Sequence, residues 1–372
     1  MAFLDEDEAR VLVDDYMRLE GSAVSTQDIL DSGAISRLQG YIAKPGKVSD
    51  SIFGGKGSYF DKKRGERVEF ENPPLTTSDG VPIRLMVRSE RISTHDINRG
   101  VIAFKDQVLA VNHHFMLRLL ARSLGNSQFD VDGLNDNGVV IAAENLTPIP
   151  LEFVLRRYMA KSTTSTSLYS AYMMGNREFA GHFLPEGLIA NGILPYLIDT
   201  PSTKSEEHDE TISERKALAL MLCSAQQYNE MRSRGFYGFG IADEFFSRRN
   251  VILADTKLEF GVNSKGEVVV QDEVINMDSS RFWLRDDYEQ QLGQLRRGEI
   301  FELSPKSYSK EFARGFSKGD LGYTDEERAQ IAVRYILGIQ HLLGSEFLPD
   351  KRSWEERVVD GLERAVQLVM KH

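Results

Sequence analysis

Charged side chains on two neighbouring predicted strands could bind a phosphate and a metal ion. Alternating apolar and polar residues predict a strand with Asp255, Lys257 and Glu259 on one face. Residues 263–266 predict a tight turn, after which a second strand brings Asp272 back close to Glu259. Two carboxylates and a lysine suit a Mg²⁺-nucleotide site, because oxygen ligands bind the metal and an ammonium binds phosphate. The solvated face of an ordinary hairpin explains the same pattern.

A second cluster could bind an anion. Ser279, Ser280 and Arg281 stand just before a tryptophan. A guanidinium beside hydroxyl groups can hold a phosphate or a carboxylate through paired hydrogen bonds. The cluster therefore predicts a site for an anionic substrate.

Upstream, residues 151–156 alternate so that a strand would place Arg156 on the face opposite Leu151, with Ser162 in a loop beyond. A helix fits the same residues, so both interpretations stay open from the pattern alone.

Two loops carry charges that suit a phosphate. Gly46 would let backbone amides approach a phosphate and Lys47 would add a positive charge, although the full Walker pattern is absent. Residues 200–210 form a charged loop that contains Lys204. An ordinary solvated loop explains that composition equally.

The elements that must position these residues divide the chain near Pro148. Before it, short runs punctuated by glycine and proline predict strands and turns, and after it strands alternate with longer helices. The predicted parts are an N-terminal helical extension (1–40), a β-rich nucleotide-binding lobe (41–147), an α+β substrate- and metal-binding lobe (148–345) and a C-terminal helical tail packed on the second lobe (346–372).

Composition excludes several classes of protein. The 372 residues carry a net charge of -11, which argues against a nucleic-acid binder. No apolar run approaches the roughly 20 residues that span a bilayer, and acidic residues at positions 5–8 do not fit a secretory signal. Cys223 is the single cysteine, so no internal disulfide forms and a reducing compartment, the cytoplasm, is predicted. A homo-oligomer stays open.

Taken together, the motifs resemble the phosphoribosylaminoimidazole-succinocarboxamide (SAICAR) synthetase family of purine biosynthesis. The resemblance covers roughly residues 42 to 345, and the segments with the most specific motifs are residues 200–213 (TPSTKSEEHDETIS) and 278–283 (DSSRFW). Further matching segments are residues 46–50, 90–96, 148–158, 184–188, 255–261, 272–273 and 307–314.

The resemblance implies an ATP-dependent ligase. The family joins L-aspartate to carboxyaminoimidazole ribonucleotide (CAIR), giving SAICAR, ADP and phosphate through an activated, acyl-phosphate-like carboxylate. It also implies an α+β fold related to ATP-grasp and kinase-like nucleotide binders, with ATP between a β-rich N-terminal lobe and a larger α+β C-terminal lobe.

By the same resemblance, individual residues acquire roles toward ATP, Mg²⁺ and the substrates. The ATP loop would comprise Gly46, Lys47, Val48 and Ser49, with Lys257 near the phosphates. The metal ligands would be Glu259 and Asp272. Substrate would contact Ser93, Asp96, Arg156, Ser162, Ser279, Ser280 and Arg281. The catalytic group would comprise Lys257 and, on a closing loop, Lys204, His208 and Asp209; His208 or Asp209 is a candidate proton acceptor.

The sequence departs from the family pattern at Ser49 and Lys161. Ser49 stands where the family usually has Arg or Lys, and Lys161 replaces a common glycine.

Two rival functions are weighed against the ligase. A diverged paralogue that activates or phosphorylates another small carboxylate is disfavoured by the substrate cluster around Arg281. A non-catalytic nucleotide binder is disfavoured by the joint presence of Lys257, Glu259 and Asp272.

Overall fold

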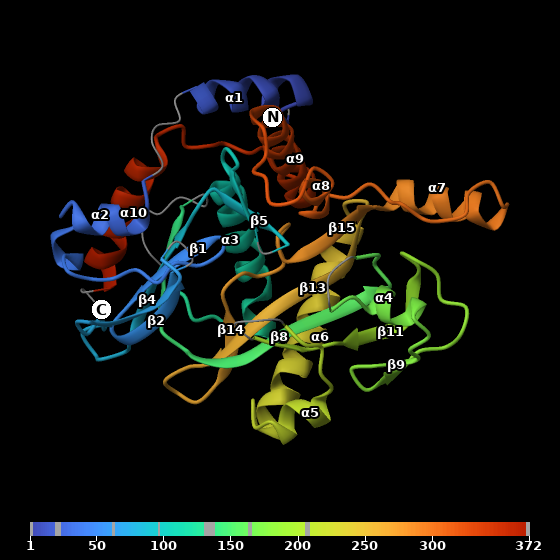
Figure 1. Ribbon diagram of the computed structural model, residues 1–372, viewed down its shortest axis with the longest axis horizontal. Helices are drawn as coiled ribbons and strands as arrows, with labels where there is room; N and C mark the ends of the chain where they lie inside the picture. The colour runs from blue at the N-terminus through green and yellow to red at the C-terminus, as the bar shows by residue number, and fades with distance from the viewer. Residues whose placement is uncertain are drawn as a thin grey trace. The chain divides into compact units, whose positions relative to one another are not determined.

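The computed structural model describes residues 3–18, 24–61, 64–95, 97–129, 138–162, 166–204 and 209–369 (Figure 1). The chain forms two compact units, which are described separately. Unit 1 comprises residues 1–114, 127–146 and 316–372, and unit 2 comprises residues 115–126 and 147–315. The chain passes from unit 1 to unit 2 between residues 146 and 147 and returns to unit 1 after residue 315. None of the helices in the described ranges is long and apolar enough to cross a membrane.

Unit 1 is built on a three-stranded antiparallel sheet in the order β1-β4-β7, with two separate hairpins, β2-β3 and β5-β6. Its strands are β1 (Ser49–Phe53), β2 (Gly55–Asp61), β3 (Glu66–Asn72), β4 (Ile83–Arg88), β5 (Arg91–Thr94), β6 (Ile97–Val101) and β7 (Val140–Glu144). Its helices are α1 (Glu6–Arg18), α2 (Thr26–Asp31), the 3₁₀ turn η1 (Ser36–Leu38), α9 (Asp325–Leu343), α10 (Trp354–Val369) and the first half of α3 (Lys105–Leu124).

Helices from both ends of the sequence complete the core of unit 1. Leu30 of α2 and Leu362 of α10 are buried in one cluster with Leu85 of β4 and Val140 of β7. Burial of such apolar side chains stabilises the unit by about 1.5–3 kcal/mol each. The prediction that the tail packs on the second lobe is therefore wrong, because the apolar face of α10 covers the first sheet.

The predicted extent of the second lobe, to residue 345, is also wrong. Helix α9 and the residues from 316 onward belong to unit 1, where α9 packs against α1 (Figure 1). Arg10 of α1 is bonded to Glu326 at the start of α9, through Nη2 and Oε2 at 2.8 Å. The helical pattern of α9 was readable from the sequence, but the surface that it covers was not.

Unit 2 is built on a six-stranded sheet, in which β11, β8, β13 and β14 are successive neighbours, β12 pairs with β8, and β15 pairs with β13. Its strands are β8 (Thr147–Tyr158), β11 (Ile193–Asp199), β12 (Ser202–Thr203), β13 (Val251–Val262), β14 (Val268–Gln271), β15 (Ser280–Leu284) and the hairpin of β9 (Glu178–Phe179) and β10 (His182–Phe183). Its helices are α4 (Leu168–Met173), α5 (Glu214–Ala219), α6 (Ala225–Ser247), α7 (Arg285–Arg296), α8 (Glu311–Arg314) and the second half of α3.

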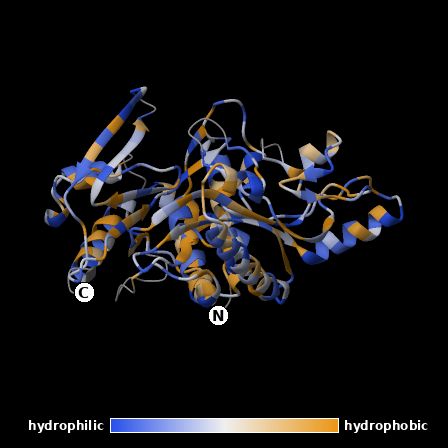
Figure 2. Ribbon diagram, turned by 90° about the horizontal axis from the view of Figure 1, so that it is seen from below, coloured by the Kyte–Doolittle hydropathy of each residue, from blue (hydrophilic) through white to orange (hydrophobic). Residues whose placement is uncertain are grey.

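The long helix α6 covers one face of this sheet, against β8 and β13 (Figure 1). Phe153 of β8 packs on Tyr228 of α6, with ring centroids 5.8 Å apart, and on Phe260 of β13. Helices in Figure 2 carry both hydrophobic and hydrophilic residues, as expected where one face meets a sheet and the other meets solvent. The α+β class predicted from the sequence is confirmed.

Candidate functional site

Strand β13 is the backbone of the candidate site in unit 2. As predicted, its buried face carries apolar residues such as Ala254 and Leu258, while Asp255, Lys257 and Glu259 share the other face. The antiparallel neighbours β8, β14 and β15 flank this strand. With about 3.3 Å of rise per residue, Asp255 and Glu259 lie roughly 13 Å apart along it, so one strand carries two separate charged clusters.

The first cluster surrounds Asp255. The strand register places this carboxylate opposite Arg156 of β8 and opposite Arg281 of β15. Arg281 donates to Asp255 Oδ2, and Arg156 Nη1 lies 3.6 Å from the same oxygen. Arg156 Nε also donates to Thr200 Oγ1 at 2.8 Å. Two guanidinium groups therefore share the Asp255 carboxylate, and Arg281 Nε also lies 3.8 Å from Glu311 Oε2.

Burial affects the chemistry of this cluster. It lowers the pKa of Arg156 to about 10, with Asp255 raising the value and Arg281 lowering it. The guanidinium is still charged at neutral pH. Because Arg156 is only 7% exposed, an anion that binds here meets positive charge with little competing water, which strengthens the attraction.

The predicted serines lie on the same sheet or next to it. Ser280 is buried on β15, and its hydroxyl is 2.8 Å from Thr256 Oγ1 on the face of the sheet opposite Asp255 and Arg281. Ser279 accepts a hydrogen bond from Asn276 N at 3.3 Å. Ser162 is buried just after β8, and its carbonyl accepts a bond from Ser170 Oγ at 3.2 Å. The neighbouring tryptophan of the motif instead packs in the core.

The second cluster is a chain of alternating charges. Lys204, which follows β12, is bonded to Glu259 Oε2. Lys257 Nζ lies 3.6 Å from Glu259 Oε1 and donates to Glu152 Oε1 at 2.5 Å. Burial opposes the charged form of Lys257, but Glu152 and then Glu259 raise its pKa above the usual range. Lys257 is therefore a cation at neutral pH.

Glu259 and Asp272 come together as predicted. Glu259 is paired in register with Gln271, the residue before Asp272. Burial raises the pKa of Glu259, and the Asp272 carboxylate raises it further, whereas Lys257 and Lys204 oppose both effects. Asp272 adopts a left-handed backbone with φ 62°. Non-glycine residues in this conformation are uncommon and concentrate at functional sites.

The donor set fits Mg²⁺ better than zinc. In the part of the chain that the structure describes, no group of three or more His, Cys, Asp or Glu side chains could hold a metal by itself. Mg²⁺ needs no such cage, because it keeps several waters and binds through one or two carboxylates together with substrate phosphates. Glu259 and Asp272 meet that requirement.

Asp209 lies at the base of the loop that follows β12. Thr203 N donates to Glu210 O at 2.9 Å, and Glu210 N donates to Thr203 Oγ1 at 3.1 Å, so the two sides of the loop are bonded beside Asp209. His208 lies outside the described residues. The roles of Lys204, His208 and Asp209 in catalysis stay predictions.

The predicted ATP loop is in unit 1. Gly46 N donates to Asp50 Oδ1 at 3.2 Å, and a side chain at position 46 would meet Ser49 O at 2.2 Å, so only glycine fits. Lys47 and Val48 follow, and Ser49 begins β1. We call residues 46–49 the glycine loop.

Two of the predicted substrate residues belong to the unit 1 part of the chain. Ser93 lies on β5, where it pairs with Asn98 of β6. Asp96 lies outside the described residues. Ser93 is therefore in a different unit from the cluster that surrounds Asp255.

Sequence reasoning missed the partners of the predicted residues. Asp255 was noted only as a polar residue of its strand, although it holds both arginines, and Glu152 and Thr200 were given no role. The sequence pattern could have identified Glu152, since a strand over these residues places it on the same face as Arg156. The contacts of Asp255 and Thr200 with the arginines could be predicted only by knowing which strands are neighbours in the sheet.

Comparison with known proteins decides the family. The family model described as SAICAR synthetase matches residues 77–329. This chain belongs to the SAICAR synthetase family. A relative from Mesorhizobium japonicum, a "Putative phosphoribosylaminoimidazole-succinocarboxamide synthase 2", is 31% identical over 72% of this chain and 85% of its own length. The predicted function as a ligase of purine biosynthesis is confirmed.

Solved SAICAR synthetases share the fold. The SAICAR synthase from Saccharomyces cerevisiae, complexed with SAICAR, is 22% identical, has a TM-score of 0.63, and covers 88% of this chain and 99% of its own. A type-2 SAICAR synthetase in complex with ADP has a TM-score of 0.56 and 19% identity, and covers 83% of this chain and 100% of its own. The family match begins at residue 77 and does not include the glycine loop.

Proposed function

We propose that this chain binds CAIR and a Mg²⁺-bound nucleotide through the polar face of the unit 2 sheet, and joins CAIR to L-aspartate with conversion of ATP to ADP and phosphate. The observation that carries the proposal is the pair of charged clusters on β13. A ribonucleotide with a carboxylated base has an anion at each end, and this strand offers an arginine cluster at Asp255 and a lysine-carboxylate cluster at Glu259.

The arginine cluster suits the phosphate of CAIR. Arg156 and Arg281 already share Asp255. Guanidinium groups bind phosphate through paired hydrogen bonds that an ammonium cannot reproduce. Because both guanidinium groups contact Asp255, their positions are fixed before the substrate binds, and little side-chain freedom is lost on binding.

The lysine-carboxylate cluster suits the nucleotide phosphates. Glu259 and Asp272 would hold Mg²⁺, which when bound neutralises phosphate charge. Lys257 would lie near the transferred phosphate, and Lys204 would contribute a second cation beside Glu259. The existence of a structurally similar SAICAR synthetase in complex with ADP supports the use of an adenine nucleotide by this chain.

The reaction needs positioning more than a covalent enzyme group. The carboxylate of CAIR is a poor electrophile until ATP converts it to an acyl phosphate, which the aspartate amine then attacks with release of phosphate. Oriented cations stabilise the charge that develops during transfer. The amine must lose a proton, for which Asp209 or His208 is the proposed acceptor.

The decisive experiment measures ADP release from ATP with CAIR, with and without L-aspartate. Release that requires CAIR and increases with aspartate, together with formation of SAICAR, is expected. Aspartate-independent release without SAICAR would instead indicate a paralogue that phosphorylates its substrate. Replacement of Cys223 by Ser provides a control, because that residue lies in no part of the proposed site.

A further inference from the structure

The glycine loop of unit 1 is held by the chain segment that connects β4 to β5, residues 88–91. Ser89 donates to Val48 O through its backbone N at 3.0 Å and its Oγ at 2.9 Å. Arg91 donates through Nη2 to Gly46 O at 3.1 Å. Ser89 and Arg91 of this connection therefore hold the loop at Val48 and at Gly46.

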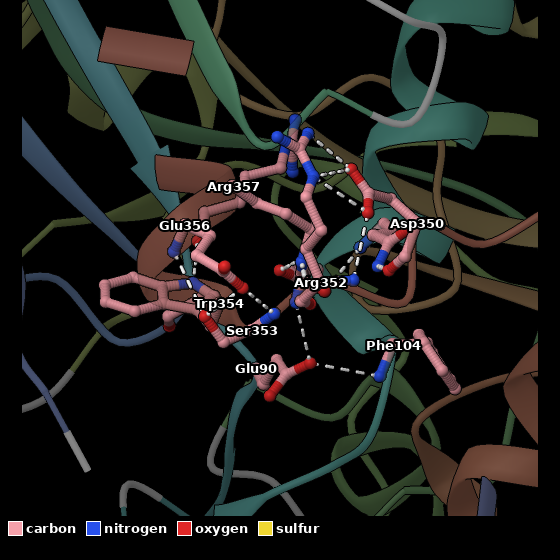
Figure 3. A network of polar contacts seen from close by, with 12 residues as sticks. Glu90, Phe104, Asp350, Arg352, Ser353, Trp354, Glu356 and Arg357 are labelled. Carbon is pink, nitrogen blue, oxygen red and sulfur yellow. Dashed lines mark hydrogen bonds and ion pairs between the residues drawn. The ribbon is translucent and has the colours of Figure 1, made fainter. Parts of the chain in front are cut away.

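The even-numbered residues of the same connection are held by α10. Trp354 Nε1 donates to Arg88 O at 2.9 Å. Arg357 Nη2 donates to Glu90 Oε1 at 3.2 Å (Figure 3). These two residues of α10 are three positions apart and so lie on one face of the helix. Helix α10 thus holds the backbone of Arg88 and the side chain of Glu90. The residues between and after them, Ser89 and Arg91, hold the glycine loop.

Arg357 is the centre of this arrangement. It is only 5% exposed, and it also donates to Asp106 Oδ2 at 2.6 Å and to Tyr16 OH at 2.8 Å. Tyr16 OH in turn donates to Glu90 Oε1 at 2.9 Å. Removing one member of a buried charged network leaves the others uncompensated. Loss of Arg357 would therefore leave Glu90 Oε1 with the bonds from Tyr16 OH and Phe104 N but without its cation.

A second support reaches the loop from α2. Thr26 Oγ1 donates to Asp50 Oδ2 at 2.7 Å. Asp50 Oδ1 accepts bonds from Gly46 N at 3.2 Å and from Arg91 Nη2 at 2.5 Å. Thr26 and Asp50 are both buried. Segments from both sides of the family match, before residue 77 and after residue 329, thus converge on the supports of one loop.

We propose that α10, acting through Arg357 as a positioning residue, sets the affinity of the glycine loop for nucleotide phosphates, with Thr26 as a secondary support. This inference deepens the proposed function and depends on the assignment of the glycine loop to ATP. A loop whose backbone is held in place before binding loses less conformational freedom when the phosphate binds. The helices outside the family match therefore tune nucleotide affinity and do not contact the nucleotide.

The test compares Arg357→Met with Arg364→Met, a matched control on the same helix whose guanidinium bonds to Asp360 at an exposed position. The Kd for ADP in the presence of Mg²⁺ is measured by calorimetry, and the KM values for ATP and CAIR by ADP release. Arg357→Met should raise the Kd for ADP and the KM for ATP about tenfold, the effect of one lost charge-assisted bond. The KM for CAIR should stay within about twofold. Arg357→Lys should have a Kd for ADP and a KM for ATP between those of the wild type and Arg357→Met. The Arg364→Met control should have the wild-type values.

Unchanged affinity for ADP in a folded Arg357→Met variant would overturn the inference, as would equal losses for ADP and CAIR. If that variant does not fold, Trp354→Phe and Thr26→Val decide, because each removes a single hydrogen bond and keeps most of the side-chain volume. Weaker ADP binding in both supports the inference, and wild-type affinity in both rejects it. A wild-type protein that does not bind ADP would reject the proposed ATP site itself.

Discussion

Glu259 lies directly opposite Glu152 in the antiparallel pairing of β13 with β8. Like charges at such positions repel. Lys257 resolves the conflict because its Nζ contacts both carboxylates, at 2.5 Å from Glu152 Oε1 and 3.6 Å from Glu259 Oε1. One lysine therefore has a structural role in the sheet and a proposed role toward phosphate, and the two roles can be separated.

Lys257→Met should lower both turnover and stability. Loss of the cation removes a stabiliser of phosphate charge, which should reduce kcat by about 10²–10³-fold. It also leaves Glu152 without its lysine and Glu259 with Lys204 alone, which should cost about 1–3 kcal/mol in urea unfolding. The double variant Glu152→Gln with Lys257→Met should regain stability without regaining turnover. Recovery of both in the double variant would show that Lys257 has only the structural role.

Arg281→Lys should raise the KM for CAIR far more than the KM for ATP. Lysine keeps a positive charge but cannot form two parallel bonds to a phosphate, so a change of about tenfold is expected for CAIR. Arg297→Lys is the control, because Arg297 is exposed and pairs only locally with Glu299. Equal changes in both KM values would place Arg281 outside the substrate site.

Glu259→Gln and Asp272→Asn should each lower turnover by orders of magnitude while leaving CAIR binding without ATP nearly unchanged. Each amide preserves the shape and removes one charge from the proposed metal shell. Titration with excess Mg²⁺ or Mn²⁺ should restore part of the activity, since a weaker site fills at higher metal concentration. Full turnover in both variants would return the hairpin to its interpretation as a solvated strand face.

The stability of unit 2 should fall in acid through Asp199. Burial alone would raise the pKa of this carboxyl, but hydrogen bonds from His182, Tyr228 and Arg232 lower it from 3.8 to about 2. A depressed folded-state pKa stabilises the protein above the unfolded value, and this stabilisation is lost as the pH falls from about 4 through about 2. It is worth about 2 kcal/mol at pH 7.

Asp199→Asn should therefore lose that stability at pH 7 and show a weaker dependence on pH between about 4 and 2. Thermal unfolding across this range measures both effects. Tyr228→Phe removes one donor to the carboxylate, at 2.7 Å, and should give an intermediate slope. An identical pH dependence in wild type and Asp199→Asn would show that other carboxyl groups control acid unfolding.

Local patterns predicted the candidate site better than the domain organisation. Period-two alternation identified β13 and the turn at residues 263–266, so the approach of Asp272 to Glu259 followed from a single hairpin. The strand alternative for residues 151–156 was also correct. The sharing of Asp255 by two arginines was missed, because β8 and β15 are far from β13 in sequence and their register depends on the whole sheet.

The misplacement of the C-terminal helices has a different cause. An amphipathic pattern shows that α10 buries one face, but it does not show which sheet that face covers. The predicted C-terminal tail (346–372) does contain a helix, α10, which spans Trp354–Val369. The assignment to the second lobe came only from proximity in sequence, and Val358 and Leu362 in the core of unit 1 contradict it.

The discontinuous composition of unit 1 has a consequence for biosynthesis. The ribosome makes the strands of its sheet by residue 144, but the α10 residues that cover this sheet and hold the connection at residues 88–91 are made only after all of unit 2. At about 5–20 residues per second, the part of the apolar face that α10 covers stays exposed for roughly ten seconds or more. Ribosome stalling within residues 147–315 lengthens that interval and should therefore favour aggregation of newly made chains.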